Sequence, residues 1–233
     1  DHRDLHVRSR RQRQMCIRDR DYDGLLKKSF PSTFEEVNYF STYKIKLIHN
    51  LTKNKNNINI LDFGCGTGTS LKIISKYFKS SKIWGYDVSK EFIKKIKKQK
   101  NNFKLTSNLK DIPNKKFDLI FVSMVFHHVD KKNHHKILSC CKKFLKNNGV
   151  LYIFEHNPLN PVTNYIFKNN PIDKNAEMVS PKKLITKSIK TKLKIVDLKY
   201  TLFFPKQLYF FRFFEKFLFW LPFGAHYLLT LKK

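Results

Sequence analysis

Three glycines lie within five residues of one another, at Gly64, Gly66 and Gly68, directly after the apolar run 58–63. A glycine accepts positive φ angles, and a ligand can approach its backbone closely because it has no side chain. The residues that follow have a helical pattern, and the first turn of a helix offers free N–H groups and the positive end of its dipole to an anionic group. This turn therefore predicts a binding site for a nucleotide-like ligand.

The spacing of the glycines and two nearby carboxylates narrow the choice of ligand. A dinucleotide site requires G-x-G-x-x-G, and Thr69 stands where its third glycine would be. Asp87 ends the next apolar segment, where a carboxylate can accept both ribose hydroxyls of an adenosine. Asp62 precedes the first glycine by two residues and can hold an ammonium group. S-adenosylmethionine (SAM) fits these groups because it brings the ribose and the ammonium but no pyrophosphate, and a different nucleotide is the alternative.

Several motifs resemble those of the class I SAM-dependent methyltransferases, in particular the group called methyltransferase type 11. The segment 61–68, LDFGCGTG, resembles the first motif of that family, and Asp87 fits its ribose-binding acid. The remaining matches are Asp111-Ile112-Pro113 with the segment 117–120, His127-His128-Val129, and Asn148-Gly149. The resemblance covers about residues 58–157. It implies an α/β, Rossmann-like fold with a mainly parallel seven-stranded sheet and helices on both faces.

The same resemblance implies which residues bind SAM. The expected contacts are Asp62, Gly64, Cys65, Gly66, Gly68, Asp87, Val88, Asn108, Leu109, Ser123 and Met124. At position 108 the family usually has an aspartate, which accepts a hydrogen bond from the adenine amino group. The side-chain carbonyl of Asn108 can accept the same bond, so we expect adenine binding to be kept but weakened.

The acceptor side is expected in the segment 155–161, EHNPLNP, which resembles a subgroup of this family with an E-H-N-P-x-N-P motif after strand five. His156 is the candidate for a base or an acceptor ligand, with Glu155 orienting it, because an oxygen nucleophile can need its proton removed. The alternative is that both residues make structural hydrogen bonds that shape the loop. His127 and His128 are also candidates for proton removal, but structural roles are the expectation for them, and the sequence predicts no metal cluster.

Alternating strands and helices must bring these residues to one edge of a sheet. Short apolar runs predict strands, and apolar residues at helical spacing predict helices between them. The expected strands are 58–63, 82–86, 103–106, 117–123, 150–155, 195–203 and 226–231. Helices are expected up to residue 51 and over 69–77, 89–99 and 134–145, with a turn at 147–149. Repeated strand–helix units favour a parallel sheet covered on both faces.

The segment 203–223 carries nine phenylalanines besides Tyr209 and Trp220. A helix that is apolar on almost all sides must be buried, lie on a membrane or line an apolar pocket. Because this segment joins two expected strands of one sheet, we expect it to pack in the core and form an acceptor pocket. Peripheral membrane contact is the alternative.

The chain has 233 residues, which suits one α/β domain. Residues 1–20 hold seven of the eight arginines and no lysine, whereas the rest of the chain holds 39 lysines. We interpret 1–20 as a disordered arm, a cloning remnant or a sequencing artefact, with a nucleic-acid-binding arm as the alternative. Residues 21–233 are interpreted as a single domain, with a SAM-binding core over about 58–157 and an aromatic acceptor or cap region over about 158–233.

The formal net charge of +29 is compatible with a lysine-rich solvated surface and with attraction to nucleic acid or an anionic membrane. The four cysteines form no CxxC pair, and no apolar run approaches the ~20 residues needed to cross a bilayer. We therefore expect a cytoplasmic protein, with membrane association left open.

Together these features predict a SAM-dependent methyltransferase that methylates a small molecule, a glycan precursor or a lipid-linked acceptor, most simply at oxygen. An RNA methyltransferase and a non-catalytic SAM-binding module are the alternatives. The sequence has no separate RNA-binding module and no Asn/Asp-Pro-Pro-Tyr motif, so nucleic acid is not the expected partner.

Overall fold

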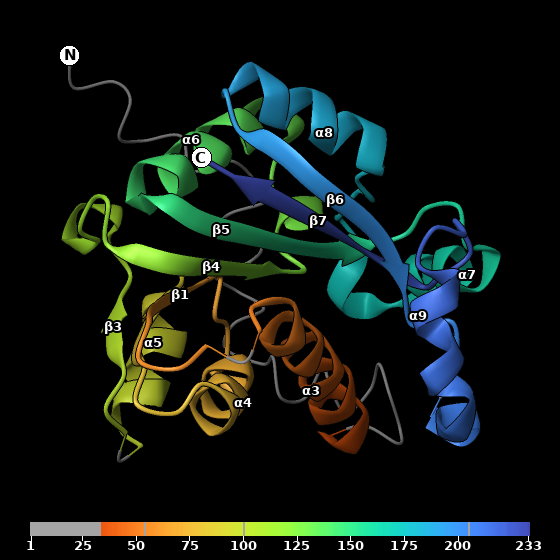
Figure 1. The fold of residues 1–233 in the computed structure, drawn as a ribbon, viewed down its shortest axis with the longest axis horizontal. Helices are drawn as coiled ribbons and strands as arrows, with labels where there is room; N and C mark the ends of the chain where they lie inside the picture. The colour runs from red at the N-terminus through yellow and green to blue at the C-terminus, as the bar shows by residue number, and fades with distance from the viewer. Residues whose placement is uncertain (1–33, 54, 100, 205) are drawn as a thin grey trace.

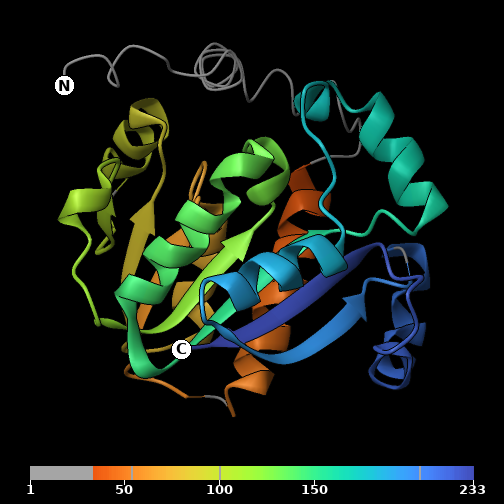
Figure 2. The same ribbon diagram turned by 90° about the horizontal axis from the view of Figure 1, so that it is seen from above.

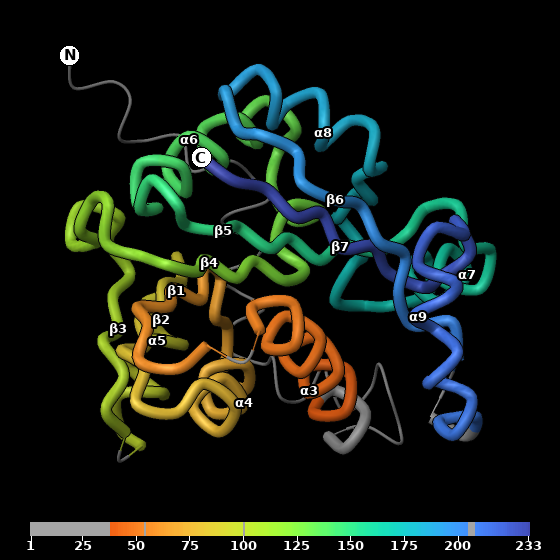
Figure 3. The backbone as a smooth tube through the Cα atoms, in the orientation of Figure 1, coloured from red at the N-terminus to blue at the C-terminus, as the bar shows by residue number. Residues whose placement is uncertain are grey.

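The computed structural model describes residues 34–53, 55–99, 101–204 and 206–233. Seven strands form one sheet in the order β3-β2-β1-β4-β5-β7-β6. Their bounds are β1 (Asn59–Phe63), β2 (Lys82–Tyr86), β3 (Lys104–Thr106), β4 (Phe117–Ser123), β5 (Leu145–His156), β6 (Lys194–Thr201) and β7 (His226–Lys232). Strands β1 to β5 pair in parallel, whereas β7 pairs antiparallel with both β5 and β6. Figure 3 shows β7 lying between these two strands. This confirms the expected Rossmann-like α/β fold. The expected arm, 1–20, lies outside the described residues.

Helices cover both faces of this sheet (Figure 1). On one face lie α3 (Phe34–Leu51), α4 (Thr69–Tyr77) and α5 (Lys90–Lys97). On the other lie α6 (His134–Phe144) and α8 (Pro181–Lys190), which are seen in front of the sheet in Figure 2. The remaining helices are α7 (Pro161–Asn169), α9 (Glu215–Leu218) and the 3-10 helices η2 (Leu109–Asp111), η3 (Phe126–His128), η4 (Lys131–Asn133), η5 (Pro171–Asp173) and η6 (Lys206–Phe214).

The strands are apolar because both of their faces are buried. Ile60 on β1 packs with Ile45 of α3 and Leu71 of α4, while its neighbour Leu61 packs in the opposite cluster with Leu138 of α6. Successive side chains of a strand point to opposite faces, so a strand covered on both sides shows a continuous apolar run. That pattern is why the expected strands agree with the observed ones to within a few residues over most of the sheet.

Two segments differ from expectation. The predicted turn at 147–149 lies inside β5. The pairing with β4 passes there from Phe117↔Leu145 to Leu119↔Val150, so β5 has more residues than β4 at this point. The additional residues of β5 form a bulge and do not end the strand. Helices α7 and α8 were not predicted. Each begins with proline after an N-cap residue, Asn160 or Ser180, which is a recognisable helix start.

The aromatic segment does not form the expected buried helix. It consists of η6, which is interrupted at Leu208, followed by the single turn α9. Its exposed side chains include Phe213, Phe217 and Trp220, which is 74% exposed. The expectation of core packing is therefore wrong for these residues, because the two strands that the segment joins pair directly without it. No helix in the described part of the chain is both long and apolar enough to cross a membrane.

Candidate functional site

The glycine turn connects β1 to α4 and is fixed to the end of β2. The φ angles of Gly64, Gly66 and Gly68 are +88°, +51° and +85°, which favour glycine. The backbone N–H groups of Gly64 and Cys65 donate to the carbonyl oxygen of Tyr86, at 2.7 and 2.9 Å. A Cβ atom added at Gly66 would meet no atom of the described residues within 4 Å. Gly66 therefore offers the open backbone that a ligand needs.

Asp62 provides a buried carboxylate beside this turn. Its Oδ2 atom is buried and has no hydrogen-bond partner among the described residues. Burial and the nearby carboxylate of Asp87 raise the pKa of Asp62 well above its usual range. A cation placed against Asp62 would relieve both effects, so the residue fits the ammonium group that the sequence predicted for it.

Asp87 follows β2 and joins the glycine turn to the next helix. Its Oδ2 accepts from the N–H of Gly66 at 2.8 Å, and its Oδ1 accepts from the N–H of Ser89 at 2.9 Å. A carboxylate has about four lone-pair sites, so it can accept from ribose hydroxyls in addition to these N–H groups.

Two other expected cofactor contacts lie beside Asp87 and in the glycine turn. Val88, which follows Asp87, is 46% exposed. The Cys65 side chain is buried toward the sheet, where its Sγ lies 3.1 Å from the position of a Cβ at Gly85, so Cys65 can offer the ligand only its backbone.

Asn108 and Leu109 begin the short helix η2 after β3. The Asn108 side-chain oxygen accepts from the N–H of Lys110 at 3.1 Å, and its amide donates to Asp111 at 3.4 Å. Asn108 is exposed, and Leu109 packs partly against the core. The predicted adenine contact at Asn108 therefore has to share an oxygen that already caps a helix.

Ser123 ends β4 and Met124 follows it, next to the glycine turn. Met124 has a φ angle of +58°, a strained conformation for a residue with a side chain, and such strain often marks a functional site. The Ser123 hydroxyl accepts from the Nζ of Lys44 at 3.1 Å. Burial lowers the pKa of Lys44 to about 7, although the carboxylate of Glu155 opposes this effect. Lys44 lies on α3 and had no signal in the sequence.

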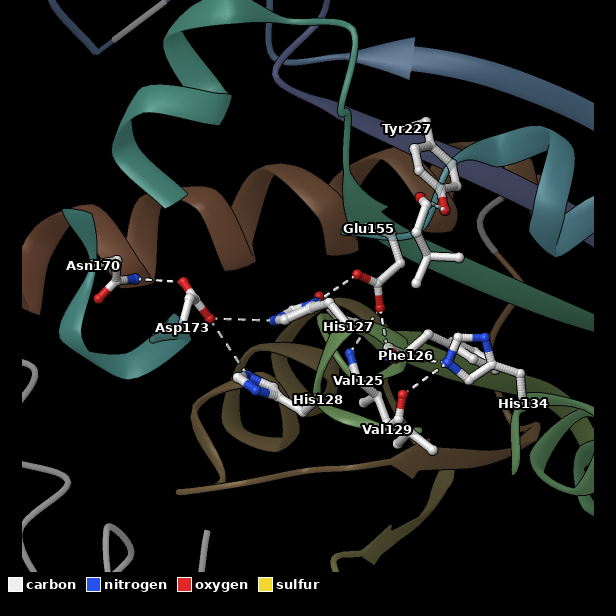
Figure 4. Close-up of polar contacts among 12 residues, drawn as sticks. Val125, Phe126, His127, His128, Val129, His134, Glu155, Asn170, Asp173 and Tyr227 are labelled. Atoms are coloured by element: carbon white, nitrogen blue, oxygen red, sulfur yellow. Dashed lines mark hydrogen bonds and ion pairs between the residues drawn. The ribbon is translucent and has the colours of Figure 1, made fainter. Parts of the chain in front are cut away.

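Glu155 pairs with His127 and not with the neighbouring His156. Its Oε2 lies 2.6 Å from His127 Nδ1, and its Oε1 accepts from the N–H groups of Val125 and Phe126 at 2.9 and 2.7 Å (Figure 4). The expectation that Glu155 orients His156 is thus wrong. Both oxygens of Glu155 are engaged by His127 and by the loop after β4, so Glu155 does not hold the His156 ring.

His156 is half-buried and lies among aromatic rings. Its ring centroid lies 5.0 Å from that of His127, 5.1 Å from His226 and 5.3 Å from Phe167. Its Nδ1 is buried without a hydrogen-bond partner among the described residues. Burial, with the charge of His127 nearby, lowers the pKa of His156 to about 3, so its imidazole is neutral at physiological pH.

Asp173 on η5 was not predicted as a site residue, and it lies next to His127 and His128, which follow β4. The Asp173 Oδ1 lies 3.5 Å from His127 Nε2 and 3.6 Å from His128 Nε2. Burial alone would lower the pKa of His127, but the carboxylates of Glu155 and Asp173 raise it to about 9. These atoms could hold a metal ion, a possibility that the sequence did not indicate because Asp173 is 45 residues from His128.

Comparison with known proteins identifies a family to which the chain is similar. The sequence model of a family described as "Methyltransferase domain" matches residues 36–185. A 99-residue segment is 37% identical to malonyl-[acyl-carrier protein] O-methyltransferase 2 of Ilyobacter polytropus and covers 40% of this chain and 37% of that protein. The chain spans less than half of the length of the three curated relatives it matches, namely 37%, 41% and 47%.

Solved structures share the fold. A SAM-dependent methyltransferase from Archaeoglobus fulgidus superposes with a TM-score of 0.66 at 20% identity, over 91% of this chain and 100% of that chain. The cyclopropane synthase of Mycobacterium tuberculosis superposes with a TM-score of 0.57 at 16% identity, over 82% of this chain and 83% of that chain. Both likenesses cover a larger share of the chain than the matched family segment, 36–185.

Proposed function

Because the chain belongs to the class I SAM-dependent methyltransferases, we propose that it transfers the methyl group of SAM to an oxygen of an acceptor with an apolar part. A lipid-linked molecule is the favoured acceptor, and a glycan precursor or another small molecule is the broader class. Membership of the type 11 group and of the E-H-N-P-x-N-P subgroup stays a prediction, as does the cytoplasmic location.

The cofactor would lie across the carboxyl ends of β1, β2 and β4. Asp62 would hold the ammonium, Asp87 the ribose hydroxyls, and the open backbone at Gly66 would allow close approach. When bound, SAM supplies an activated methyl group, so that a carbon–oxygen bond forms as the sulfur–carbon bond breaks and the acceptor oxygen loses its proton. The protein's task is then mainly to hold the acceptor in line with that methyl group.

One observation carries the proposal for the acceptor: the exposed aromatic segment is tied to the loop that follows His156. The Asn157 side chain donates to the carbonyl oxygens of Pro222 and Gly224 at 3.0 and 2.8 Å. Asn160 donates to the carbonyl of Phe223 at 2.6 Å. An apolar chain lying on the aromatic side chains could therefore present its polar end to the site.

Two further observations bear on methylation at oxygen and on the role of His156. The relative from Ilyobacter polytropus is named an O-methyltransferase. His156 ends β5 at the same edge of the sheet as Ser123 and Met124, with Ser123 pairing with Phe154. A carboxylate paired with His156 would make it a stronger base, but Glu155 binds His127 instead. We therefore assign His156 the role of orienting the acceptor.

The aromatic segment also supports peripheral membrane contact, which would bring the protein to a lipid-linked acceptor. Large apolar patches on a protein surface commonly mark interaction sites. Phe213, Phe217 and Trp220 are each more than 60% exposed. The net charge of +29 would add attraction to an anionic bilayer.

The test of this function is to follow the methyl group of radiolabelled SAM into a cell extract. We expect label in the organic-soluble fraction, with none from the Gly66→Ala variant, which should fold but bind SAM poorly. Alkaline hydrolysis would then separate a methyl ester from an ether. Label in RNA would favour an RNA methyltransferase, and tight SAM binding with no labelled product in any fraction would favour a non-catalytic module; either result would overturn the proposal.

A further inference from the structure

Three potential metal ligands converge outside the expected cofactor site. They are the Nε2 atoms of His127 and His128 on η3 and the Oδ1 atom of Asp173 on η5 (Figure 4). All three lie within 4.8 Å of one another. Two imidazoles and one carboxylate form a donor set that suits divalent transition-metal ions.

The distances within this cluster suit a shared ion better than direct hydrogen bonds. Asp173 Oδ1 lies 3.5 Å from His127 Nε2 and 3.6 Å from His128 Nε2. Hydrogen bonds between nitrogen and oxygen are shorter, at about 2.7–3.2 Å. Ligands at about 2.0–2.2 Å from a tetrahedral ion lie roughly 3.3–3.6 Å from one another. The two distances from Asp173 therefore match the spacing of neighbouring ligands on one ion, and the third distance, between the histidine nitrogens, is at most 4.8 Å.

Further hydrogen bonds fix the orientation of two of the ligands. Glu155 Oε2 lies 2.6 Å from His127 Nδ1, which leaves the Nε2 of that ring for the cluster. Asn170 Nδ2 donates to Asp173 Oδ2 at 2.6 Å, which leaves Oδ1 for the cluster. A carboxylate on the far nitrogen of a ligating histidine is a common support of metal sites, because it fixes the tautomer and the orientation of the ring.

The burial of the cluster is uneven. The side chains of His127 and Asp173 are 1% and 5% exposed, whereas that of His128 is 28% exposed. An ion held by these three residues would have a dry protein side and an open side next to His128. Metal sites with three protein ligands keep such an open position for water or substrate.

We propose that His127, His128 and Asp173 bind one divalent transition-metal ion such as Zn²⁺, with a fourth position open to water or an acceptor oxygen. The competing account is a metal-free cluster in which protonated His127 is shared between the carboxylates of Glu155 and Asp173. The two accounts differ in a simple measurement, the binding of Zn²⁺ itself. That measurement needs neither SAM nor an acceptor, so its failure would leave the proposed methyl transfer untouched.

The experiment starts from protein treated with a chelator and freed of it. Zn²⁺ is titrated calorimetrically, and Co²⁺ is titrated as a coloured probe of coordination geometry. We expect about one ion per chain with affinity in the micromolar range or tighter, and an affinity at least about tenfold lower in His128→Ala and Asp173→Asn. His135→Ala is the matched control, because His135 is an exposed histidine of α6 outside the cluster, and it should bind like the wild type.

Variants that fold poorly would confuse this result, so thermal unfolding is measured for each. His128→Ala is the safer variant because its side chain is partly exposed. The double variant His128→Ala/Asp173→Asn separates this cluster from other ligands in the chain, including His2, His6 and Cys16. Wild-type protein that binds no Zn²⁺, or a folded double variant that binds it as tightly as wild type, would overturn the proposal.

Discussion

Glu155 Oε2 and His127 Nδ1 lie 2.6 Å apart in a buried contact that joins the end of β5 to the loop after β4. The other oxygen of Glu155 accepts the N–H groups of Val125 and Phe126. Burial alone would raise the pKa of Glu155, but His127, the charge of His156 and the N–H of Phe126 lower it overall, so the carboxylate is ionised. The Glu155 side chain thus fixes the loop that joins Met124, on the expected methionine side of the cofactor, to His127 of the proposed metal site.

Replacement of Glu155 by alanine should therefore be strongly destabilising. It would leave two buried N–H groups and His127 without their acceptor, and breaking a buried charged pair costs about 3–5 kcal/mol. Urea unfolding at neutral pH measures this loss, with Glu155→Gln as a milder variant if the alanine variant does not fold. Glu177→Ala is the control, since the ion pair of Glu177 with Lys131 is exposed and should contribute less than about 1 kcal/mol. A loss below about 1 kcal/mol for Glu155→Ala would contradict this role.

Two glycines of the turn should respond differently to alanine. Gly66→Ala meets no neighbour within 4 Å, so it should cost only the roughly 1–2 kcal/mol of a left-handed conformation and yet weaken SAM binding, because the methyl group fills the ligand's approach. Gly64→Ala would place its Cβ 2.4 Å from Val125 Cγ2 and should destabilise the fold as well. Thermal unfolding and SAM titration of both variants check this. Normal SAM affinity in folded Gly66→Ala would contradict the proposed contact.

Lys44 should make stability depend on pH in the alkaline range. Its folded pKa is about 7 against an ordinary 10.5, so between these values the unfolded chain holds a proton that the folded chain has released. Wild-type stability should then rise with pH, by up to about 1.4 kcal/mol per pH unit from this group. The charged or titratable groups around it are Glu155, His156 and His226.

Lys44→Met isolates this contribution because all other groups are shared with the wild type. The variant should be the more stable protein near pH 7, and the difference should shrink as the pH approaches 10.5. Urea unfolding at several pH values measures it. If the difference between the two proteins does not change with pH, Lys44 is not buried in a way that lowers its pKa.

The exposed aromatic side chains should bind anionic vesicles at low salt. Wild-type protein is expected to sediment with phosphatidylserine-containing liposomes and to be released as salt screens the charges. The triple variant Phe213→Ser/Phe217→Ser/Trp220→Ser should lose most of this binding. Ile189→Ser/Val196→Ser is the matched control, since it removes exposed apolar side chains on α8 and β6. Sedimentation of the triple variant like wild type, or none of the wild type, would count against membrane contact.

Local patterns predicted the sheet and the glycine turn because each is encoded by adjacent residues. The apolar runs mark strands buried on both faces, and positive φ at Gly64 and Gly66 follows from residue type. The helix expected over 89–99 likewise begins where predicted, because the Ser89 hydroxyl accepts from the N–H of Phe92 and caps α5. These features do not depend on distant parts of the chain.

The group formed by His127, His128 and Asp173 and the exposure of the aromatic segment 203–223 depend on contacts between residues far apart in the sequence. Asp173 meets His127 only because α7 and η5 return over the carboxyl edge of the sheet. Glu155 pairs with His127, which is 28 residues away in the sequence, so adjacent residues did not indicate its partner. The exposure of Phe213 and Trp220 follows from direct pairing of β6 with β7, which leaves the connecting segment outside the sheet.

Titration of wild type and Asp62→Asn with SAM tests the central claim most directly. Asp62 Oδ2 has no hydrogen-bond partner among the described residues, so this substitution removes the carboxylate expected to face the ammonium at little cost in hydrogen bonds and should leave the fold at least as stable. We predict that wild type binds SAM and that Asp62→Asn, still folded, binds it at least about tenfold more weakly. Wild-type protein that gives no binding at millimolar SAM, or an Asp62→Asn variant with unchanged affinity, would contradict the account.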